Sequence, residues 1–116
     1  GIVLNIVREA ERQAQIHHVN KIGSLTLEVG ELTGAEPRYI RNCWPAAIEN
    51  TILDGAELII KEVEGLVTCN DCGCVYRVLE HMKADYKPDC PECHSDQWTL
   101  KQGRQVVIDE IGVIDG

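Results

Sequence analysis

The stretch that decides the fold is CNDCGCVYRVLEHMKADYKPDCPEC, residues 69–93. It begins and ends with two cysteines that are separated by two residues, Cys69 with Cys72 and Cys90 with Cys93. Two cysteines at this spacing in a tight turn can direct both sulfurs at one ion, and a second pair completes a tetrahedron. Seventeen residues separate the pairs, the usual reach of a zinc ribbon. We therefore predict one zinc site with four ligands, Cys69, Cys72, Cys90 and Cys93.

The chemistry of this site favours a structural role. A catalytic zinc keeps one position open for water or substrate, and four cysteines leave none. Four free thiols or a redox pair are the alternative to a metal. Cys74, one residue beyond Gly73, could replace Cys72 as a ligand, although the Cys-x-x-Cys-Gly spacing favours Cys72. His94 directly follows Cys93; we expect an exposed loop histidine, the alternative being a side chain that exchanges with a thiolate ligand.

Composition excludes several classes of protein. The net charge is −8, so the chain has no general attraction for phosphate backbones, and we expect no nucleic acid partner. No apolar run is long enough to cross a bilayer and no signal-peptide pattern is present. Four of the six cysteines form the two pairs, which indicates a reducing compartment. We therefore expect a cytoplasmic protein without a membrane partner.

Outside the metal stretch, the spacing of apolar residues predicts two helices and three strands. Apolar residues recur at helical spacing in the first segment, and strands are indicated by period-two alternation. Proline suits a first helical position, and Pro37 therefore begins the second helix, whereas Pro45 should bend or break it. The expected elements are a helix over 1–18, a strand over 24–30, a helix over 37–51 and strands over 56–63 and 105–114.

The last two strands share an apolar-acidic rhythm, and we expect them to pair with each other antiparallel. The cysteine-rich stretch between them is then an insertion. The predicted fold class is α+β: a three-stranded sheet with two helices, plus an inserted four-cysteine zinc-ribbon module. The predicted domains are residues 1–64 plus 99–116, and residues 65–98.

Other candidate residues have simpler explanations. Cys43 on the second helix is expected in the core. His17 and His18 close the first helix, where cationic side chains suit the negative end of the helix dipole, and we prefer this to metal binding. The sequence contains no Ser/His/Asp order and no phosphate-binding glycine loop. We therefore predict a protein that is not an enzyme.

The chain resembles the HypA/HybF family of hydrogenase nickel-insertion accessory proteins over almost its full length. The matching stretches are residues 2–7 (IVLNIV), 27–37 (LEVGELTGAEP), 55–58 (GAEL), the two cysteine pairs and 103–111. The resemblance implies a nickel-binding α/β domain with a zinc ribbon. It also implies transient binding of Ni(II) and its delivery, with a maturation GTPase, to the large subunit of nickel-iron hydrogenase; some relatives also serve urease.

The resemblance places the nickel ligand outside the numbered residues. The family binds nickel through a histidine directly after the initiator Met, in a Met-His-Glu start, and through backbone nitrogens. Because this sequence begins at Gly1, with the apolar period already running at Ile2, we expect a few residues ahead of Gly1 and the nickel ligands among them. The alternative functions are a zinc-ribbon interaction adaptor that handles no nickel and, least supported, a zinc hydrolase. The oligomeric state, monomer or homodimer, stays open.

Overall fold

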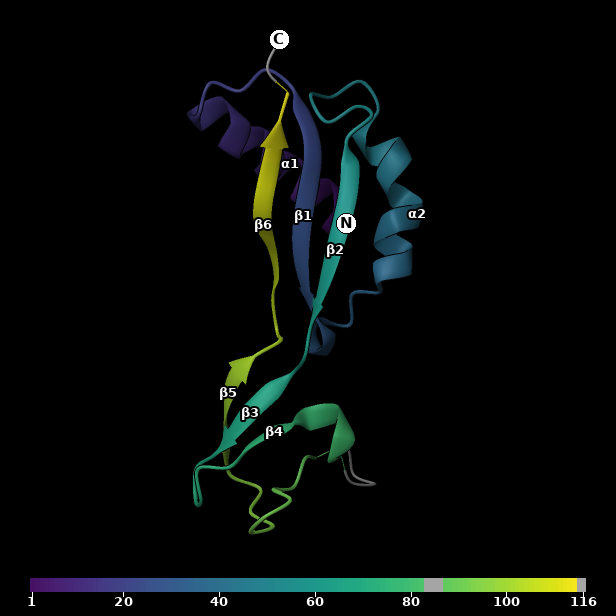
Figure 1. The fold of residues 1–116 in the computed structure, drawn as a ribbon. Coiled ribbons are helices and arrows are strands. Elements are labelled where there is room, and N and C mark those ends of the chain that lie inside the picture. The colour runs from purple at the N-terminus through teal and green to yellow at the C-terminus, as the bar shows by residue number, and fades with distance from the viewer. Residues whose placement is uncertain (83–86, 115–116) are drawn as a thin grey trace. The chain divides into compact units, whose positions relative to one another are not determined.

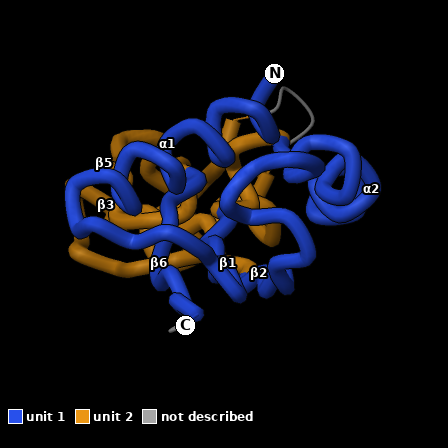
Figure 2. The backbone as a smooth tube through the Cα atoms, turned by 90° about the horizontal axis from the view of Figure 1, so that it is seen from above, with its two compact units in different colours: residues 1–29, 35–61, 106–116 blue, residues 30–34, 62–105 orange. Residues whose placement is uncertain are grey.

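The computed structural model describes residues 1–82 and 87–114. The chain divides into two compact units (Figure 2). The helix unit comprises residues 1–29, 35–61 and 106–116, and the cysteine unit comprises residues 30–34 and 62–105. That the domains lie at 1–64 plus 99–116 and at 65–98 stays a prediction, and residues 83–86 and 115–116 fall outside the described part of the chain.

The helix unit is a three-stranded sheet with both helices on one face (Figure 1). Its strands are β1 (Ile22–Gly30), β2 (Glu57–Val63) and β6 (Val106–Val113), in the order β2-β1-β6. β6 is antiparallel to β1. β1 and β2 run in the same direction in Figure 1, because α2 (Pro37–Ile48) provides the crossover between them. The first helix, α1, spans Ile2–Ile16.

The core of the helix unit is aliphatic, as the absence of phenylalanine requires. α1 buries residues at helical spacing, and Leu25, Leu27 and Leu58 meet them from the sheet. Trp44 of α2 donates a hydrogen bond from Nε1 to the carbonyl of Ala56 (3.0 Å), so its one polar group is satisfied inside the core. The buried residues of the two helices are Val3, Ile6, Val7, Ala10, Ala14, Ile40, Trp44 and Ile48.

Two predictions about this unit are wrong. Strands β2 and β6 do not pair with each other, because β1 lies between them. β1 buries three consecutive residues, Leu25, Thr26 and Leu27, and has a neighbouring strand on each side, as the central strand of a sheet does. β2 and β6 alternate with exposed charges, as edge strands do. Pro45 also fails to break α2, which continues to Ile48 because Trp44 and Ile48 hold it against the core on either side.

The cysteine unit contains a second three-stranded sheet, in the order β4-β3-β5, with both pairings antiparallel. Its strands are β3 (Leu66–Cys69), β4 (Val75–Arg77) and β5 (Trp98–Gln102), and two short 3-10 helices, η1 (Glu31–Thr33) and η2 (Val78–Glu80), accompany them. Glu31 of η1 accepts hydrogen bonds from the Arg77 guanidinium at 2.7 and 2.9 Å and from the Gly65 amide at 2.7 Å. These bonds join η1 to β3 and β4.

The start of this unit depends on two glycines. A Cβ atom on Gly30 would clash with the carbonyl oxygen of Gly103, and Gly103 itself has φ +99°, which L side chains rarely adopt. Gly30 therefore allows two backbone segments to touch. Neither helix in the described part of the chain is long and apolar enough to span a membrane.

Candidate metal centre

The structure brings together the four cysteines that the sequence predicts as ligands. The sulfurs of Cys69, Cys72, Cys90 and Cys93 all lie within 4.8 Å of one another. Each Cys-x-x-Cys turn is called a knuckle, the first with Cys69 and Cys72 and the second with Cys90 and Cys93. Between the knuckles, the sulfurs of Cys69 and Cys93 are 3.5 Å apart, and so are those of Cys72 and Cys90. A tetrahedral zinc ion with Zn–S bonds of about 2.3 Å would separate its sulfurs by about 3.8 Å. The donor set and its spacing therefore fit such an ion.

The two knuckles have the same backbone hydrogen bonds. In the first, the Gly73 amide donates to the Cys69 carbonyl (3.0 Å) and the Cys69 amide donates to Cys74 (2.8 Å). In the second, the His94 amide donates to Cys90 (2.9 Å) and the Cys90 amide donates to the Ser95 carbonyl (3.0 Å). Each turn therefore presents two sulfurs to the same side.

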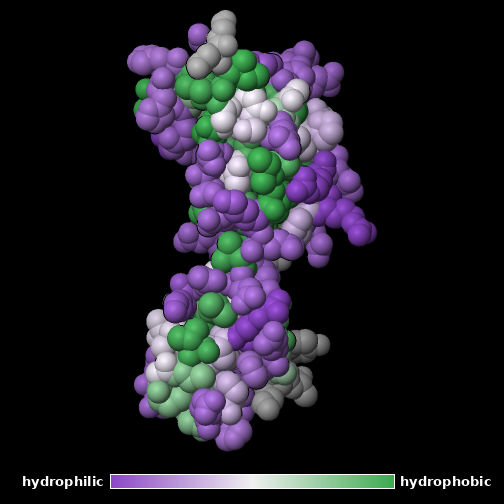
Figure 3. Space-filling view, viewed as in Figure 1, coloured by the Kyte–Doolittle hydropathy of each residue, from purple (hydrophilic) through white to green (hydrophobic). Residues whose placement is uncertain are grey.

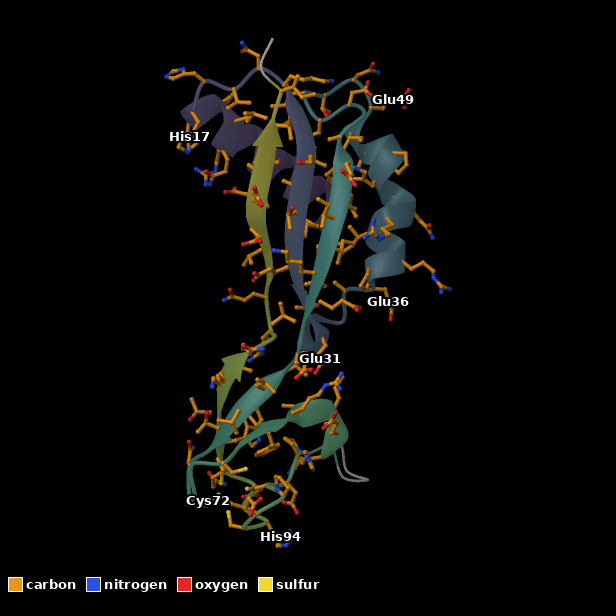
Figure 4. The ribbon with its side chains drawn as sticks, viewed as in Figure 1. His17, Glu31, Glu36, Glu49, Cys72 and His94 are labelled. Carbon is orange, nitrogen blue, oxygen red and sulfur yellow. The ribbon has the colours of Figure 1, made fainter. Side chains whose placement is uncertain are left out.

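Because the hydrogen bonds of the two knuckles correspond, Cys74 and His94 can each be matched to a residue in the other knuckle. Cys74 occupies the place that Ser95 holds in the second knuckle, and its sulfur is not part of the four-sulfur cluster. His94 corresponds to Gly73, and both have positive φ, +61° for His94 and +77° for Gly73. The His94 side chain is exposed (Figure 4). The first knuckle thus has the glycine that this turn favours, whereas the second holds a histidine in a strained conformation.

Burial divides the four cysteines in the same way in each knuckle. Cys69 and Cys90, the first of each pair, are buried at 2% and 0% exposure, while Cys72 and Cys93 are exposed. The buried cysteines are part of a small core with Val67, Tyr76 and Val78. A metal bound by these sulfurs would therefore be held between this core and solvent, and its loss would remove one side of the core.

The electrostatics of the cluster favour a cation. Burial alone would raise the pKa of Cys90, but hydrogen bonds from the amides of Cys93 and Glu92 lower it to about 6. The Ser95 amide favours a Cys93 thiolate, yet the neighbouring sulfurs, that of Cys69 first, raise the pKa of Cys93 to about 12. The Cys90 thiol can thus ionise while the Cys93 thiol holds its proton. A bound dication removes this conflict, because it stabilises all four thiolates together.

Sequence reasoning missed the polar groups that join the first cysteine turn to Ser95, Gln97 and Thr99. The Ser95 hydroxyl donates a hydrogen bond to the Asp71 carboxylate, and the Asn70 amide donates to the carbonyl of Gln97 (2.9 Å). The Thr99 hydroxyl donates to the Asn70 side chain (2.7 Å). Asn70 and Asp71 lie between the two cysteines of the first pair. Short polar residues at such positions could have predicted these hydrogen bonds. These bonds hold the turn that carries Cys69 and Cys72 in place without contacting the ligands themselves.

The remaining candidates lie away from the cluster. Cys43 is half-buried and packs against the core of the helix unit, as predicted. His17 is the residue that ends α1, and His18 follows it; both are exposed. Among the described residues, the four cysteines are the one group of histidine, cysteine and carboxylate side chains close enough to hold a metal ion.

Comparison with known proteins gives one consistent family. A family model described as hydrogenase/urease nickel incorporation, metallochaperone, HypA, matches residues 1–113. A hydrogenase maturation factor HypA from Chlorobium limicola is 34% identical over all of this chain and 96% of its own length. One from Crocosphaera subtropica is 33% identical over 97% of this chain and 92% of its own length.

A solved structure shares the fold. The solution structure of the nickel metallochaperone HypA from Helicobacter pylori matches 99% of this chain and 96% of its own, with a TM-score of 0.68 and 19% identity. The predicted fold class, a sheet with two helices and a four-cysteine module, is confirmed by this match and by the sulfur cluster.

Proposed function

Because the chain belongs to the HypA family of hydrogenase nickel-incorporation metallochaperones, we propose that it binds Ni(II) transiently and delivers it to nickel-iron hydrogenase during maturation. The observation that supports this proposal is the match of the family model over residues 1–113, which includes both units. A metallochaperone is an accessory protein and not an enzyme. Its partners in this proposal are a maturation GTPase and the hydrogenase large subunit, in the cytoplasm; urease is a second acceptor.

Zinc has a separate role in this proposal. Zn²⁺ bound by Cys69, Cys72, Cys90 and Cys93 would hold the cysteine unit in shape, and nickel would be the cargo. Four thiolates suit zinc far better than magnesium or calcium, and a site without an open position does not release its metal readily. A cargo site has the opposite requirement, since a donor must bind more weakly than its acceptor. The two metals therefore need different ligand sets.

We place the nickel site at the start of α1, where the Gly1 carbonyl accepts the Asn5 amide and no side chain caps the helix. A histidine and deprotonated backbone amides ahead of Gly1 would supply nitrogen ligands, which suit Ni(II). Such nitrogens must lose protons before they bind, so affinity for nickel should fall as pH drops.

The test compares three zinc-loaded chains by calorimetric titration with Ni(II). One begins at Gly1, the second carries Met-His-Glu ahead of Gly1, and the third carries Met-Ala-Glu. We expect the second to bind one Ni(II) at least tenfold more tightly than the other two and to transfer it to a stronger chelator. Equal nickel affinity of all three chains would contradict this nickel site. If all three chains retain zinc but none transfers nickel to the chelator, the adaptor function is favoured.

A further inference from the structure

One face of the sheet in the helix unit has no helix against it. α1 and α2 both pack on the face that carries Leu25, Leu27 and Leu58. Figure 1 shows β1, β2 and β6 in front of the helices, so the opposite face is open to the viewer. Side chains alternate along a strand, and the register pairs Glu28 with Val107. The open face is therefore formed by Thr26, Glu28, Glu57, Ile59, Lys61, Val107, Asp109, Glu110 and Gly112.

The open face has aliphatic side chains on both of its edge strands. Ile59 of β2 is 38% exposed and Val107 of β6 is 39% exposed. Hydrophobic side chains are visible among polar ones over this face in Figure 3. Both side chains are β-branched, and they lie on opposite sides of the central strand β1. They give a partner an apolar area to bury.

Carboxylates outnumber cations on the same face. Lys61 Nζ lies 3.0 Å from Asp109 Oδ2, across the sheet from β2 to β6. The hydrogen bond with Asp109 is the main reason that the pKa of Lys61 is raised, and the charges of Glu28 and Glu110 add to it. Lys61 therefore lies among three carboxylates, and Glu57 adds a fourth negative charge to the face. With these five groups ionised, the face has an excess of three negative charges.

This charge selects among the possible occupants. Nucleic acid and anionic lipid headgroups would be repelled by the carboxylates. A second copy of the chain, docked through the same face, would place like charges opposite each other. A protein surface with lysine or arginine side chains around an aliphatic centre would instead pair with the carboxylates and cover Ile59 and Val107.

We propose that the open sheet face docks a basic, aliphatic-centred surface of the protein with which this chain exchanges nickel. This inference rests on the proposed function, because that function supplies the partner. The dock is separate from the sulfur cluster, which belongs to the cysteine unit. The affinity of the open face for its partner is expected to fall as salt concentration rises, because salt screens the carboxylates. The contribution of Ile59 and Val107 should not depend on ionic strength.

The test uses the zinc-loaded full chain with the purified maturation GTPase and, separately, the purified hydrogenase large subunit from the same organism. The face variant is Glu28→Lys with Glu110→Lys. Its matched control is Glu11→Lys with Glu49→Lys, the same change of charge on the helices; Figure 4 labels Glu49 at the end of α2. We expect the face variant to bind one partner at least tenfold more weakly at low salt, and the control to bind it within threefold of wild type.

A second variant, Ile59→Ala with Val107→Ala, removes the aliphatic part. It should weaken binding by a similar factor at all salt concentrations, whereas the charge variant should flatten the salt dependence. Circular dichroism of each variant must match wild type; if the charge reversal unfolds the sheet, Glu28→Gln with Glu110→Gln replaces it, with a smaller expected loss.

The outcomes separate the two proposals. If wild type binds neither partner, the proposed function fails. If wild type binds a partner and both face variants bind it as tightly, the docking site is overturned while the function stands. If the face variants change only the sedimentation of the chain by itself, a second copy occupies the face and the proposal is wrong.

Discussion

The two units of this molecule are stabilised in different ways. Among the residues that the structure describes, fifteen buried hydrophobic residues form the core of the helix unit. Five form the core of the cysteine unit, and two of these are cysteines of the sulfur cluster. An apolar core of this size can stabilise the helix unit, whereas the core of the cysteine unit is too small to do so without a further constraint. The comparison teaches that cysteines replace aliphatic residues where the chain is too short to bury enough of them.

Removal of the metal should have the largest effect. A structural zinc ion contributes about 10–16 kcal/mol of apparent binding free energy at neutral pH, and in the proposed site this would become folding free energy of the cysteine unit. With a strong chelator, we expect the amide NMR signals of residues 62–105 to lose their dispersion while those of α1, α2 and β1 keep theirs. Dispersed signals throughout the metal-free chain would show that the small core suffices.

Substitution of the cysteines separates metal loss from chelator effects. Cys69→Ser with Cys93→Ser should abolish stoichiometric zinc and unfold the same residues. Cys43→Ser is the matched control, because this thiol packs against the other core. It should retain one zinc per chain by mass spectrometry under native conditions.

The next largest effect concerns the aliphatic core. Leu27 is fully buried in β1, and Leu27→Ala should cost about 2–5 kcal/mol of unfolding free energy in the helix unit. Zinc content should not change, because Leu27 belongs to the core of the helix unit and the sulfur cluster to that of the cysteine unit. Val107→Ala, on the adjacent strand and 39% exposed, is the control and should cost less than about 1 kcal/mol. Urea unfolding of the zinc-loaded protein measures both, and equal costs would contradict the placement of the core.

A smaller effect is expected from the ion pair inside the cysteine unit. Glu31→Gln removes the charge that binds Arg77 at 2.7 Å, with an expected cost of about 1–3 kcal/mol at neutral pH. The Arg77 hydrogen bond lowers the pKa of Glu31 below its ordinary 4.5, despite partial burial. A lowered folded-state pKa stabilises the protein above the unfolded value, and this contribution is lost as pH falls through the folded value.

Glu80 provides the control for this ion pair. It contacts the same guanidinium at 3.0 Å, but its side chain is 59% exposed, compared with 17% for Glu31. Glu80→Gln should change stability by less than about 0.5 kcal/mol. Hydrogen exchange of β3 and β4 amides in the zinc-loaded protein compares the two variants, and equal protection would contradict a specific role for Glu31.

His94→Gly tests whether the second knuckle is strained. Glycine removes about 1–2 kcal/mol of left-handed strain and adds about 0.5–1 kcal/mol of unfolded-state entropy. We expect zinc affinity, measured by chelator competition, to stay the same or rise up to about tenfold, a gain of at most about 1.5 kcal/mol. A clear loss of affinity would instead show that the histidine side chain enters the metal's coordination.

The smallest effect concerns an exposed ion pair on α1. Hydrogen bonds from Arg12 and then Gln13 lower the pKa of Glu9 from 4.5 to about 2. Solvent screens this exposed pair, so Arg12→Ala should raise the pKa of Glu9 only modestly in a carboxyl NMR titration, and the unfolding midpoint at neutral pH should fall correspondingly little. The stabilisation by Glu9 is present above its unfolded pKa and is lost as pH falls through about 2. A large shift in the midpoint would place this ion pair among the main stabilising contacts.

Several elements could be predicted because their signals are local. Pro37 begins α2, and the helical spacing from Val3 to Ala14 defines α1. The sulfur cluster follows from two pairs of cysteines whose spacing fits one ion. By contrast, we predicted wrongly that β2 pairs with β6, because both have the same apolar-acidic pattern. Such a pattern shows that both strands are edge strands and does not show that they pair with each other. The left-handed turn at His94 was also missed, because histidine gives no local sign of it.

The sequence by itself determined where the two helices and the three strands of the helix unit lie and which four sulfurs gather, since both depend on residues a few positions apart. It did not predict β3, β4 and β5, because apolar periodicity fades in the cysteine-rich stretch. Only the tertiary structure decided that β1 is the central strand, that Pro45 is held in a continuous helix, and that Glu31 pairs with Arg77. These features join residues that are distant along the chain. The free energy that selects them comes from packing and desolvation of the folded units, which no local spacing records.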